Sequence, residues 1–154
     1  MTATRQVLTG HGLTAALPQR WEGRLYLRES AANPVLHLAN FALPSGRGDF
    51  GSGAVEVMGV EHAFISLVEY GAAEVGQALY AARGIPRLTV ADFAPNQLQR
   101  TLPGQLGCQR FFTHHDRPFC LYVVLGSRRH AAMLLTEVHE VLNGLEVGQR
   151  WNRL

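Results

Sequence analysis

The sequence predicts an α+β fold in which helices pack on an antiparallel β-sheet. Several short alternating or apolar segments follow one another, separated by Gly, Pro and Asn, as is typical of consecutive strands. Only two segments have helical periodicity, one in mid-chain and one near the C-terminus. Strands in succession with few helices between them favour an antiparallel sheet over a parallel one.

Length and composition indicate one globular domain. The chain has 154 residues, of which 47% are hydrophobic and 17% charged. A chain of this length removes about two thirds of its unfolded surface from water when it folds. We therefore expect residues 1–154 to form a single domain, with a polar C-terminal tail at 148–154.

Alternating and apolar runs place the expected strands. The strand at 63–70 is mostly apolar and should lie centrally, and those at 106–113 and 118–125 are close enough to pair as a hairpin. A Gly-rich loop is expected at 44–53. The other expected strands are 11–17, 23–28, 35–42, 54–58 and 145–147.

Two helices are expected from residues recurring every three or four positions. The first, at 73–83, places Val75, Ala78, Leu79 and Ala82 on one face. The second runs from Ser127, a candidate N-cap, to the stop signal Asn143-Gly144. Its apolar face would hold Ala131, Leu134, Leu135, Val138, Val141 and Leu142.

The two cysteines lie on the expected hairpin. A turn at 114–117 would pair Thr113 with Pro118 and Cys108 with Val123, so that Cys108 and Cys120 point to opposite faces of the sheet. A disulfide needs Cβ atoms about 4 Å apart. We therefore expect two buried, free thiols.

The turn sequence FFTHHDRPFC raises the question of a metal site. His114, His115 and Asp116 are adjacent, and adjacent turn residues rarely converge on one ion without a ligand from elsewhere. His37 could supply that ligand only if the sheet brings it close. Asp116 also suits a turn, because its side chain bonds to nearby backbone. The expected role is a hairpin turn, with no metal.

Charge and termini exclude several classes of function. All 14 basic residues are arginine, and they are dispersed among acidic residues rather than gathered in a stripe. This pattern argues against nucleic-acid binding. No segment has the approximately 20 apolar residues of a membrane span, and the first residues lack the apolar core of a signal peptide. We expect a cytoplasmic protein with reduced cysteines.

The Gly-rich loop contains a G-x-G-x-x-G pattern at Gly46, Gly48 and Gly51. In a dinucleotide-binding fold these glycines open a helix, whereas here the β-prone segment SGAVEVM follows them. We therefore expect a loop between strands, with Asp49 and Phe50 available for partner contacts, and no cofactor. No G-x-S-x-G or H-E-x-x-H motif is present.

Two segments near the ends resemble the PsbP-like superfamily. They are GLTAALPQRWEGR (12–24), a strand followed by Pro-x-x-Trp, and VLNGLEV (141–147), a helix running into a short strand. That superfamily includes a Ran-binding factor, a photosystem extrinsic subunit and effector chaperones. The resemblance implies an α/β/α sandwich on a central antiparallel sheet, and protein binding more often than catalysis. The residue that it carries over is Trp21, as a core anchor or an interface aromatic.

These observations favour a non-catalytic, cytoplasmic protein-interaction module: an adaptor, chaperone or accessory subunit. Its expected contact residues are Trp21, Arg24, Asp49 and Phe50. The alternative is a small-molecule-binding or hydrolytic protein whose pocket would be lined by His37, Glu69 and Arg110. The partner would be another protein of unknown identity, and the sequence leaves open whether the chain forms homo-oligomers.

Overall fold

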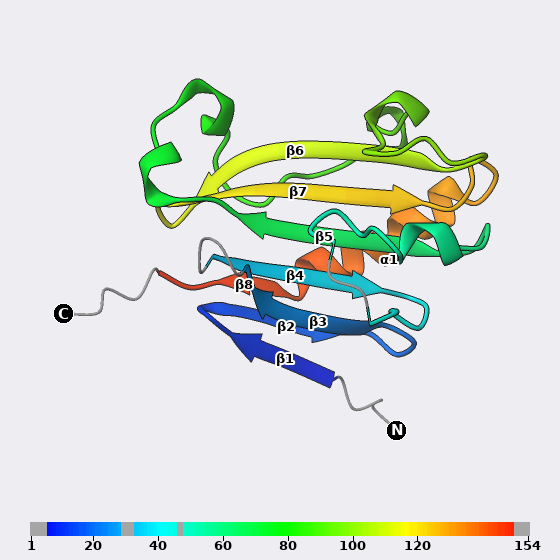
Figure 1. Cartoon of the computed structure of the whole chain (residues 1–154), viewed down its shortest axis with the longest axis horizontal. Helices are drawn as coiled ribbons and strands as arrows, with labels where there is room; N and C mark the ends of the chain where they lie inside the picture. Colours follow the sequence, from blue (N-terminus) through cyan, green and yellow to red (C-terminus); the bar gives the residue numbers. More distant parts are fainter. Residues whose placement is uncertain (1–5, 29–32, 46–47, 150–154) are drawn as a thin grey trace.

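The computed structural model describes residues 6–28, 33–45 and 48–149. These residues form two antiparallel sheets and one α-helix, α1 (Ala131–Asn143) (Figure 1). The smaller sheet has the order β1 (Gln6–Gly10), β2 (Leu13–Leu17), β8 (Leu145–Val147). The larger sheet has the order β3 (Glu22–Leu27), β4 (Pro34–Ala39), β5 (Ala63–Glu69), β7 (Arg117–Leu125), β6 (Leu106–His114).

The predicted α/β/α sandwich is wrong, because the described chain is mostly β-structure and helix covers only one face of the larger sheet. The expected helix at 73–83 is replaced by two short 3₁₀ turns, η2 (Ala72–Glu74) and η3 (Ala78–Tyr80). Gly76 lies between them with a φ of 96°, and Gln77 is extended. These backbone angles interrupt the helical period that the apolar spacing suggests.

The C-terminal helix is confirmed, with one change at its start. α1 buries the expected residues Ala131, Leu134, Leu135, Val138, Val141 and Leu142. Its first flanking residue is His130 rather than Ser127, whose Oγ accepts a hydrogen bond from the His130 N–H at 3.2 Å. Gly144 ends the helix, and its N–H reaches the Glu140 and Val141 carbonyls.

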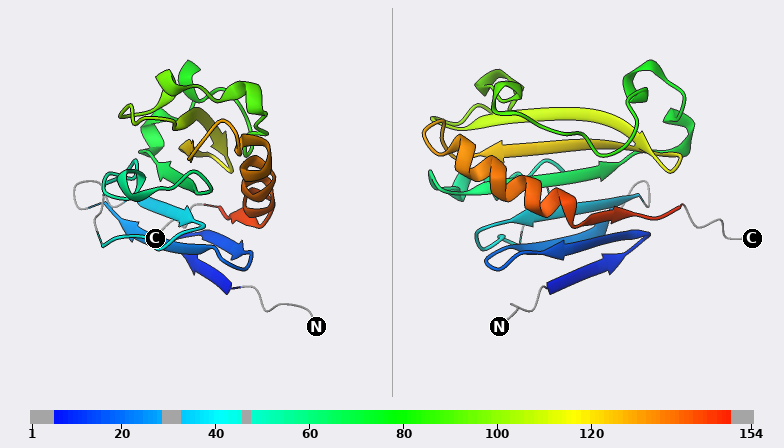
Figure 2. Two further views of the ribbon diagram at one scale, coloured as in Figure 1. Left: turned by 90° about the vertical axis from the view of Figure 1, so that its right-hand side faces the viewer. Right: turned by 180° about the vertical axis from the view of Figure 1, so that it is seen from behind.

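The main core lies between the larger sheet and the layer formed by α1 and the smaller sheet. Figure 2 shows α1 crossing one face of the larger sheet and running into β8. Alternation places Ile65 and Leu67 of β5 on this face, where they join the same apolar cluster as Leu134 and Val138 of α1. Burial of this cluster supplies the main driving force for folding.

The opposite face of the larger sheet is covered by loops. A second apolar cluster contains Phe64, Tyr122 and Val124, with Phe50 and Met58 packed against it. The segment expected as a strand at 54–58 contributes the 3₁₀ turn η1 (Val55–Val57) instead. Two further turns, η4 (Val90–Asp92) and η5 (Pro95–Gln97), lie in the connection between β5 and β6.

Two tight hairpins frame one end of the molecule. The β6–β7 register is as predicted, with Thr113 opposite Pro118 and Cys108 opposite Val123. The turn is shorter than expected, since His114 also pairs with Arg117. The two turn residues have positive φ, as a type I′ turn requires.

The first hairpin was only half predicted. A strand was expected at 11–17, whereas His11 and Gly12 form the turn between β1 and β2, with φ values of 51° and 75°. Strand β1 itself was missed. Of the expected polar tail at 148–154, only Gly148 and Gln149 lie within the described residues.

A buried arginine joins the two sheets. Arg117 and Glu69 each have 3% side-chain exposure and form an ion pair with an Nη2–Oε1 distance of 2.7 Å, and the Arg117 Nε donates to the second carboxylate oxygen at 3.0 Å. The remaining N–H groups donate to three backbone carbonyls, those of His11, Gly12 and Gly148, at 2.9–3.1 Å. All five donors of the guanidinium therefore have an acceptor.

Replacing Arg117 with Met should lower the free energy of unfolding by about 3–5 kcal/mol, because it leaves the Glu69 carboxylate buried without its partner. The double variant Arg117→Met/Glu69→Leu should be more stable than the single variant, since no uncompensated charge remains. Urea denaturation of the three proteins measures both differences. A single variant as stable as the wild type would contradict the assigned role.

Candidate functional site

The Gly-rich loop folds back over the face of the larger sheet opposite α1. Arg24 of β3 donates through Nη1 to the Pro44 carbonyl at 2.6 Å, and the Tyr26 hydroxyl donates to Asp49 Oδ1 at 3.1 Å. The Arg28 Nε lies 3.5 Å from Asp49 Oδ2. The structure thus brings together Arg24 and Asp49, two of the predicted contact residues, but through contacts within the chain.

The Asp49 carbonyl is held as firmly as its side chain. It accepts a hydrogen bond from His37 Nε2 at 3.0 Å and another from the Ser66 hydroxyl. His37 is 3% exposed, and burial lowers its pKa below the ordinary value of 6.5, although the hydrogen bond to Asp49 opposes this shift. Neutral His37 therefore carries its proton on Nε2, because a carbonyl can only accept.

Phe50 anchors the same loop. Its ring is half-buried and packs edge-on against Tyr122, with the centroids 5.7 Å apart. The next residue, Gly51, has a φ of 84°, and a Cβ there would lie 2.5 Å from the Phe64 ring. The described part of the loop is thus packed onto the sheet rather than presented to solvent as a free contact loop.

Trp21 lies on the other side of the larger sheet. Its side chain belongs to the main core and is 4% exposed, and its Nε1 donates to Glu137 Oε1 of α1 at 3.4 Å. Arg20 donates to the same oxygen at 3.0 Å. Of its two predicted roles, the core anchor fits this position, because the indole is covered by α1.

The three residues of the alternative pocket are not gathered in one place. His37 faces the Gly-rich loop, whereas Glu69 and Arg110 are on the opposite face by strand alternation. Glu69 is bound to Arg117, and Arg110 pairs with Asp92 at 3.0 Å. The sheet itself separates His37 from the other two side chains.

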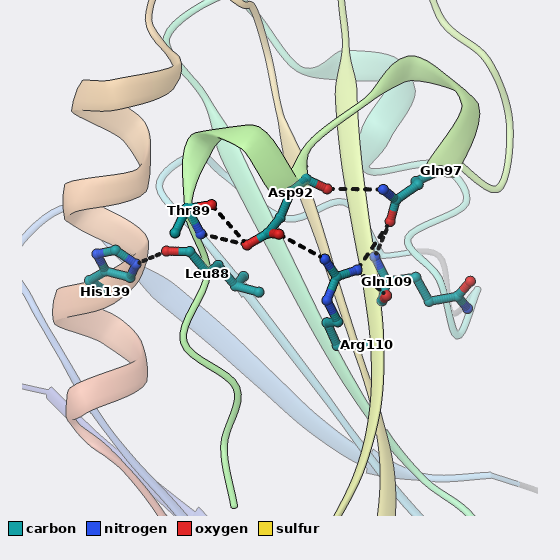
Figure 3. A network of polar contacts seen from close by, with 7 residues as sticks. All are labelled: Leu88, Thr89, Asp92, Gln97, Gln109, Arg110 and His139. Atoms are coloured by element: carbon teal, nitrogen blue, oxygen red, sulfur yellow. Dashed lines mark hydrogen bonds and ion pairs between the residues drawn. The ribbon is translucent and has the colours of Figure 1, made fainter. Parts of the chain in front are cut away.

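A polar network that the sequence did not predict surrounds Asp92 (Figure 3). Its carboxylate accepts hydrogen bonds from the Thr89 N–H at 2.7 Å and the Thr89 hydroxyl at 3.1 Å, and it pairs with Arg110. The bond from the Thr89 backbone is the largest cause of the lowered pKa of Asp92. Gln97 donates to the Asp92 carbonyl at 2.9 Å. The network fixes the segment before β6 against that strand.

This network is part of a system that closes the outer edge of β6. In an antiparallel pair, every second residue directs its N–H and C=O groups away from the partner strand. His114 and Arg117 close the two-residue turn, so in β6 these outward residues are 107, 109, 111 and 113. The Gln109 N–H donates to Gln97 Oε1 at 3.2 Å, and its carbonyl accepts from Arg110 Nη1 at 2.9 Å. Side chains thus satisfy the middle of this edge.

Backbone segments close the edge of β6 on both sides of Gln109. Gly107 exchanges two hydrogen bonds with Ala94, both of 3.0 Å. Thr113 donates to the Ala82 carbonyl at 2.8 Å and accepts from the Gly84 N–H at 2.9 Å. The described chain therefore protects nearly the whole of this edge from further strand pairing.

Within the described residues, the outer edge of β1 has no comparable cover. Gly10 and Leu13 close the two-residue turn, so Leu8 bonds toward β2 while Val7 and Thr9 direct their N–H and C=O groups outward. Among the residues that the structure describes, no backbone hydrogen bond reaches this edge. Val7 is also 59% exposed. β1 is the outermost strand on its side of the molecule in Figures 1 and 2.

The thiols and the histidine turn offer no reactive arrangement. Cys108 and Cys120 are free and buried, and burial raises the pKa of each to about 11, so the nucleophilic thiolate is disfavoured. The His114 and His115 rings lie 4.3 Å apart at the hairpin tip. In the described ranges no three His, Cys, Asp or Glu side chains are placed to share a metal ion. Nor does the helix they contain have the length and hydropathy of a membrane span.

Truncating the loop anchors should destabilise the fold. We expect Phe50→Ala to lower the free energy of unfolding by about 1–3 kcal/mol, because the ring is partly buried on Tyr122. Asp49→Ala should cost about 1 kcal/mol through the lost bond from Tyr26. Val60→Ala, at an exposed position, is the matched control and should leave the melting temperature unchanged. Unchanged stability in all three variants would instead mark the loop as a free contact surface.

His37 should make stability fall in mild acid. Because its pKa is lowered in the folded state, the unfolded chain takes up the proton first as the pH falls below 6.5. The free energy of unfolding then decreases with falling pH until the folded-state pKa is reached. His37→Gln should remove this part of the pH dependence. His114, whose pKa burial also lowers, is present in both proteins, so the difference between their denaturation curves reports His37 alone.

Comparison with known proteins assigns no relative: no protein-family model, curated protein sequence or solved structure matches this chain.

Proposed function

We propose that this chain is a non-catalytic protein-interaction module, an adaptor, chaperone or accessory subunit, that binds an extended polypeptide segment at the open edge of β1. The observation that carries the proposal is the contrast between the two edges. Five described residues supply the groups that close the edge of β6, whereas β1 presents the backbone groups of Val7 and Thr9 with no cover from the described chain. An uncovered edge of this kind accepts a further strand.

The outward backbone groups of β1 determine which partner segment could bind there. Each outward residue supplies one N–H and one C=O, so Val7 and Thr9 together can form four backbone hydrogen bonds with an added strand. The exposed side chain of Val7 adds an apolar contact on the outer face of the sheet. A partner segment rich in β-branched residues would fit beside Val7 and Thr9.

The predicted contact residues support this edge rather than touching the partner. β1 packs on β3, where a Cβ on Gly23 would lie 2.9 Å from the Leu8 side chain. Arg24 and Asp49 hold the Gly-rich loop on the opposite face of β3, and Trp21 fixes the chain just before that strand against α1. Together they give β1 a rigid base.

Proline at position 7 should weaken partner binding strongly without unfolding the protein. The N–H of Val7 points outward, so Val7→Pro removes an edge donor and no bond to β2. Val7→Ala keeps that donor and serves as the control. We expect a tagged wild-type chain and Val7→Ala to retain the same protein from a lysate of the native host, and Val7→Pro to bind it about tenfold more weakly or worse.

Amide exchange gives the second measurement. In dilute wild-type protein the N–H groups of Val7 and Thr9 should exchange fast while that of Leu8 is protected, and added partner should protect all three. A folded Val7→Pro variant that binds the partner as tightly as the wild type would reject strand addition.

A further inference from the structure

The open edge of β1 has a self-complementary character. Its five residues, Gln6–Gly10, carry no charge and no proline, two of the features that commonly guard an exposed edge. The residues that direct their backbone outward, Val7 and Thr9, are both β-branched. They lie symmetrically about Leu8, the central residue of the strand.

We infer that the strand added to β1 is β1 of a second copy of this chain, paired antiparallel about a two-fold axis at Leu8. This inference rests on the proposed function, because it names the partner of the same edge. The two copies would form a continuous six-stranded sheet with the order β8-β2-β1-β1-β2-β8. Such a contact is isologous: each copy offers the same residues to the other.

The backbone alternation restricts the register. Only residues with outward N–H and C=O groups can form hydrogen-bonded pairs, so Val7 and Thr9 must face Val7 or Thr9 of the second copy. An axis at Leu8 pairs Val7 of each copy with Thr9 of the other and overlaps all five residues of the strand. An axis at Val7 or Thr9 overlaps fewer residues of the strand and pairs only one outward residue with its own copy.

The side chains fit the same axis. Leu8 faces the interior of the molecule, packs against the main core and is only half-buried. In the paired state the two Leu8 side chains become direct neighbours in a non-hydrogen-bonded pair, whose side chains approach more closely than those of a hydrogen-bonded pair. Because Gln6–Gly10 is uncharged, the axis brings no like charges together within the strand.

The size of the contact sets its strength. A pair of five-residue strands buries much less surface than the roughly 1,600 Å² of a standard stable interface. The dimer should therefore be weak and depend on protein concentration. We expect a monomer–dimer equilibrium that shifts toward dimer over the range from roughly 1 µM to 1 mM, the affinity range of small interfaces.

Sedimentation velocity on the full chain tests the association. The wild type and Val7→Ala should show an average mass that rises with concentration toward twice the 16.9 kDa of the monomer. Val7→Pro should stay monomeric throughout, while circular dichroism shows that it remains folded. A wild type that stays monomeric up to 1 mM, or a folded Val7→Pro variant that dimerises like the wild type, would overturn the inference.

Cysteine cross-linking tests the register. Leu8→Cys should form a disulfide-linked dimer under mild oxidation, because directly opposite residues of a non-hydrogen-bonded pair have Cα atoms about 4.5 Å apart, within the range of a disulfide. Val7→Cys is the matched control, since residues 7 of the two copies are diagonal neighbours about 7 Å apart. The native Cys108 and Cys120 are buried and should not react. Cross-linking of Val7→Cys but not Leu8→Cys would reject the axis at Leu8.

The same variants separate this inference from the proposed function. If the wild type remains monomeric but Val7→Pro still loses a host protein that Val7→Ala retains, strand addition stands and the second copy is rejected as the partner. If Val7→Pro affects neither self-association nor host-protein binding, both fail.

Discussion

The guanidinium of Arg117, paired with Glu69 in the larger sheet and bonded to carbonyls of the smaller one, is the constraint that connects the two sheets. A guanidinium removed from water has a large desolvation cost, which is offset only when every donor finds an acceptor. Arg117 begins β7, and its acceptors come from the end of β5, the β1–β2 turn and the residue after β8. These segments are far apart in sequence, so the full set of acceptors is present only when both sheets are assembled. A lysine, with three donors on a single atom, could not span the same acceptors.

The hydrogen bonds of Arg117 also explain the placement of β1. Arg117 holds the carbonyls of His11 and Gly12, and so fixes the turn at one end of the first hairpin. Along its length the hairpin is held by packing of Leu8 over β3, where a Cβ on Gly10 or Gly23 would lie 2.8 Å from a Leu25 methyl or 2.9 Å from a Leu8 methyl. Because Arg117 holds the turn at one end of β1 and one face of β1 packs on β3, the outer edge of β1 stays directed away from the rest of the described chain. The fold therefore holds β1 in place while the outward N–H and C=O groups of Val7 and Thr9 stay available for hydrogen bonds.

Local patterns in the sequence predicted local structure well. The β6–β7 register, the opposite orientations of Cys108 and Cys120, and the buried face of α1 all follow from alternation or helical spacing within a few residues. The errors lie where long-range contacts decide. Apolar spacing suggested a helix at 73–83, but the positive φ of Gly76 interrupts it. Strand β1 has only five residues, most of them exposed, and so lacks the buried alternation that marks the other strands.

In the candidate site, too, local features were predicted and long-range contacts were not. Asp49 and Phe50 were singled out because Gly-rich loops often reach solvent, whereas the partners that hold them, His37 and Tyr122, lie on strands distant in sequence. Nothing local to the loop indicates that those partners are within reach. Arg117 was expected only as the last residue of the turn at 114–117, whereas the pairing of β5 with β7 brings Glu69 to it.

The unequal treatment of the two edges is the strongest physical argument for a binding role. Closing β6 requires two backbone bridges and the side chains of Gln97 and Arg110, placed at the residues whose groups point outward. Closing β1 would require much less, since one charged or proline residue at position 7 or 9 suffices to block an added strand. An edge strand without charge or proline is an aggregation hazard unless it is covered when the protein acts. Because β1 is short, uncharged and held on a rigid base, an ordered strand partner is the cover that its geometry fits best.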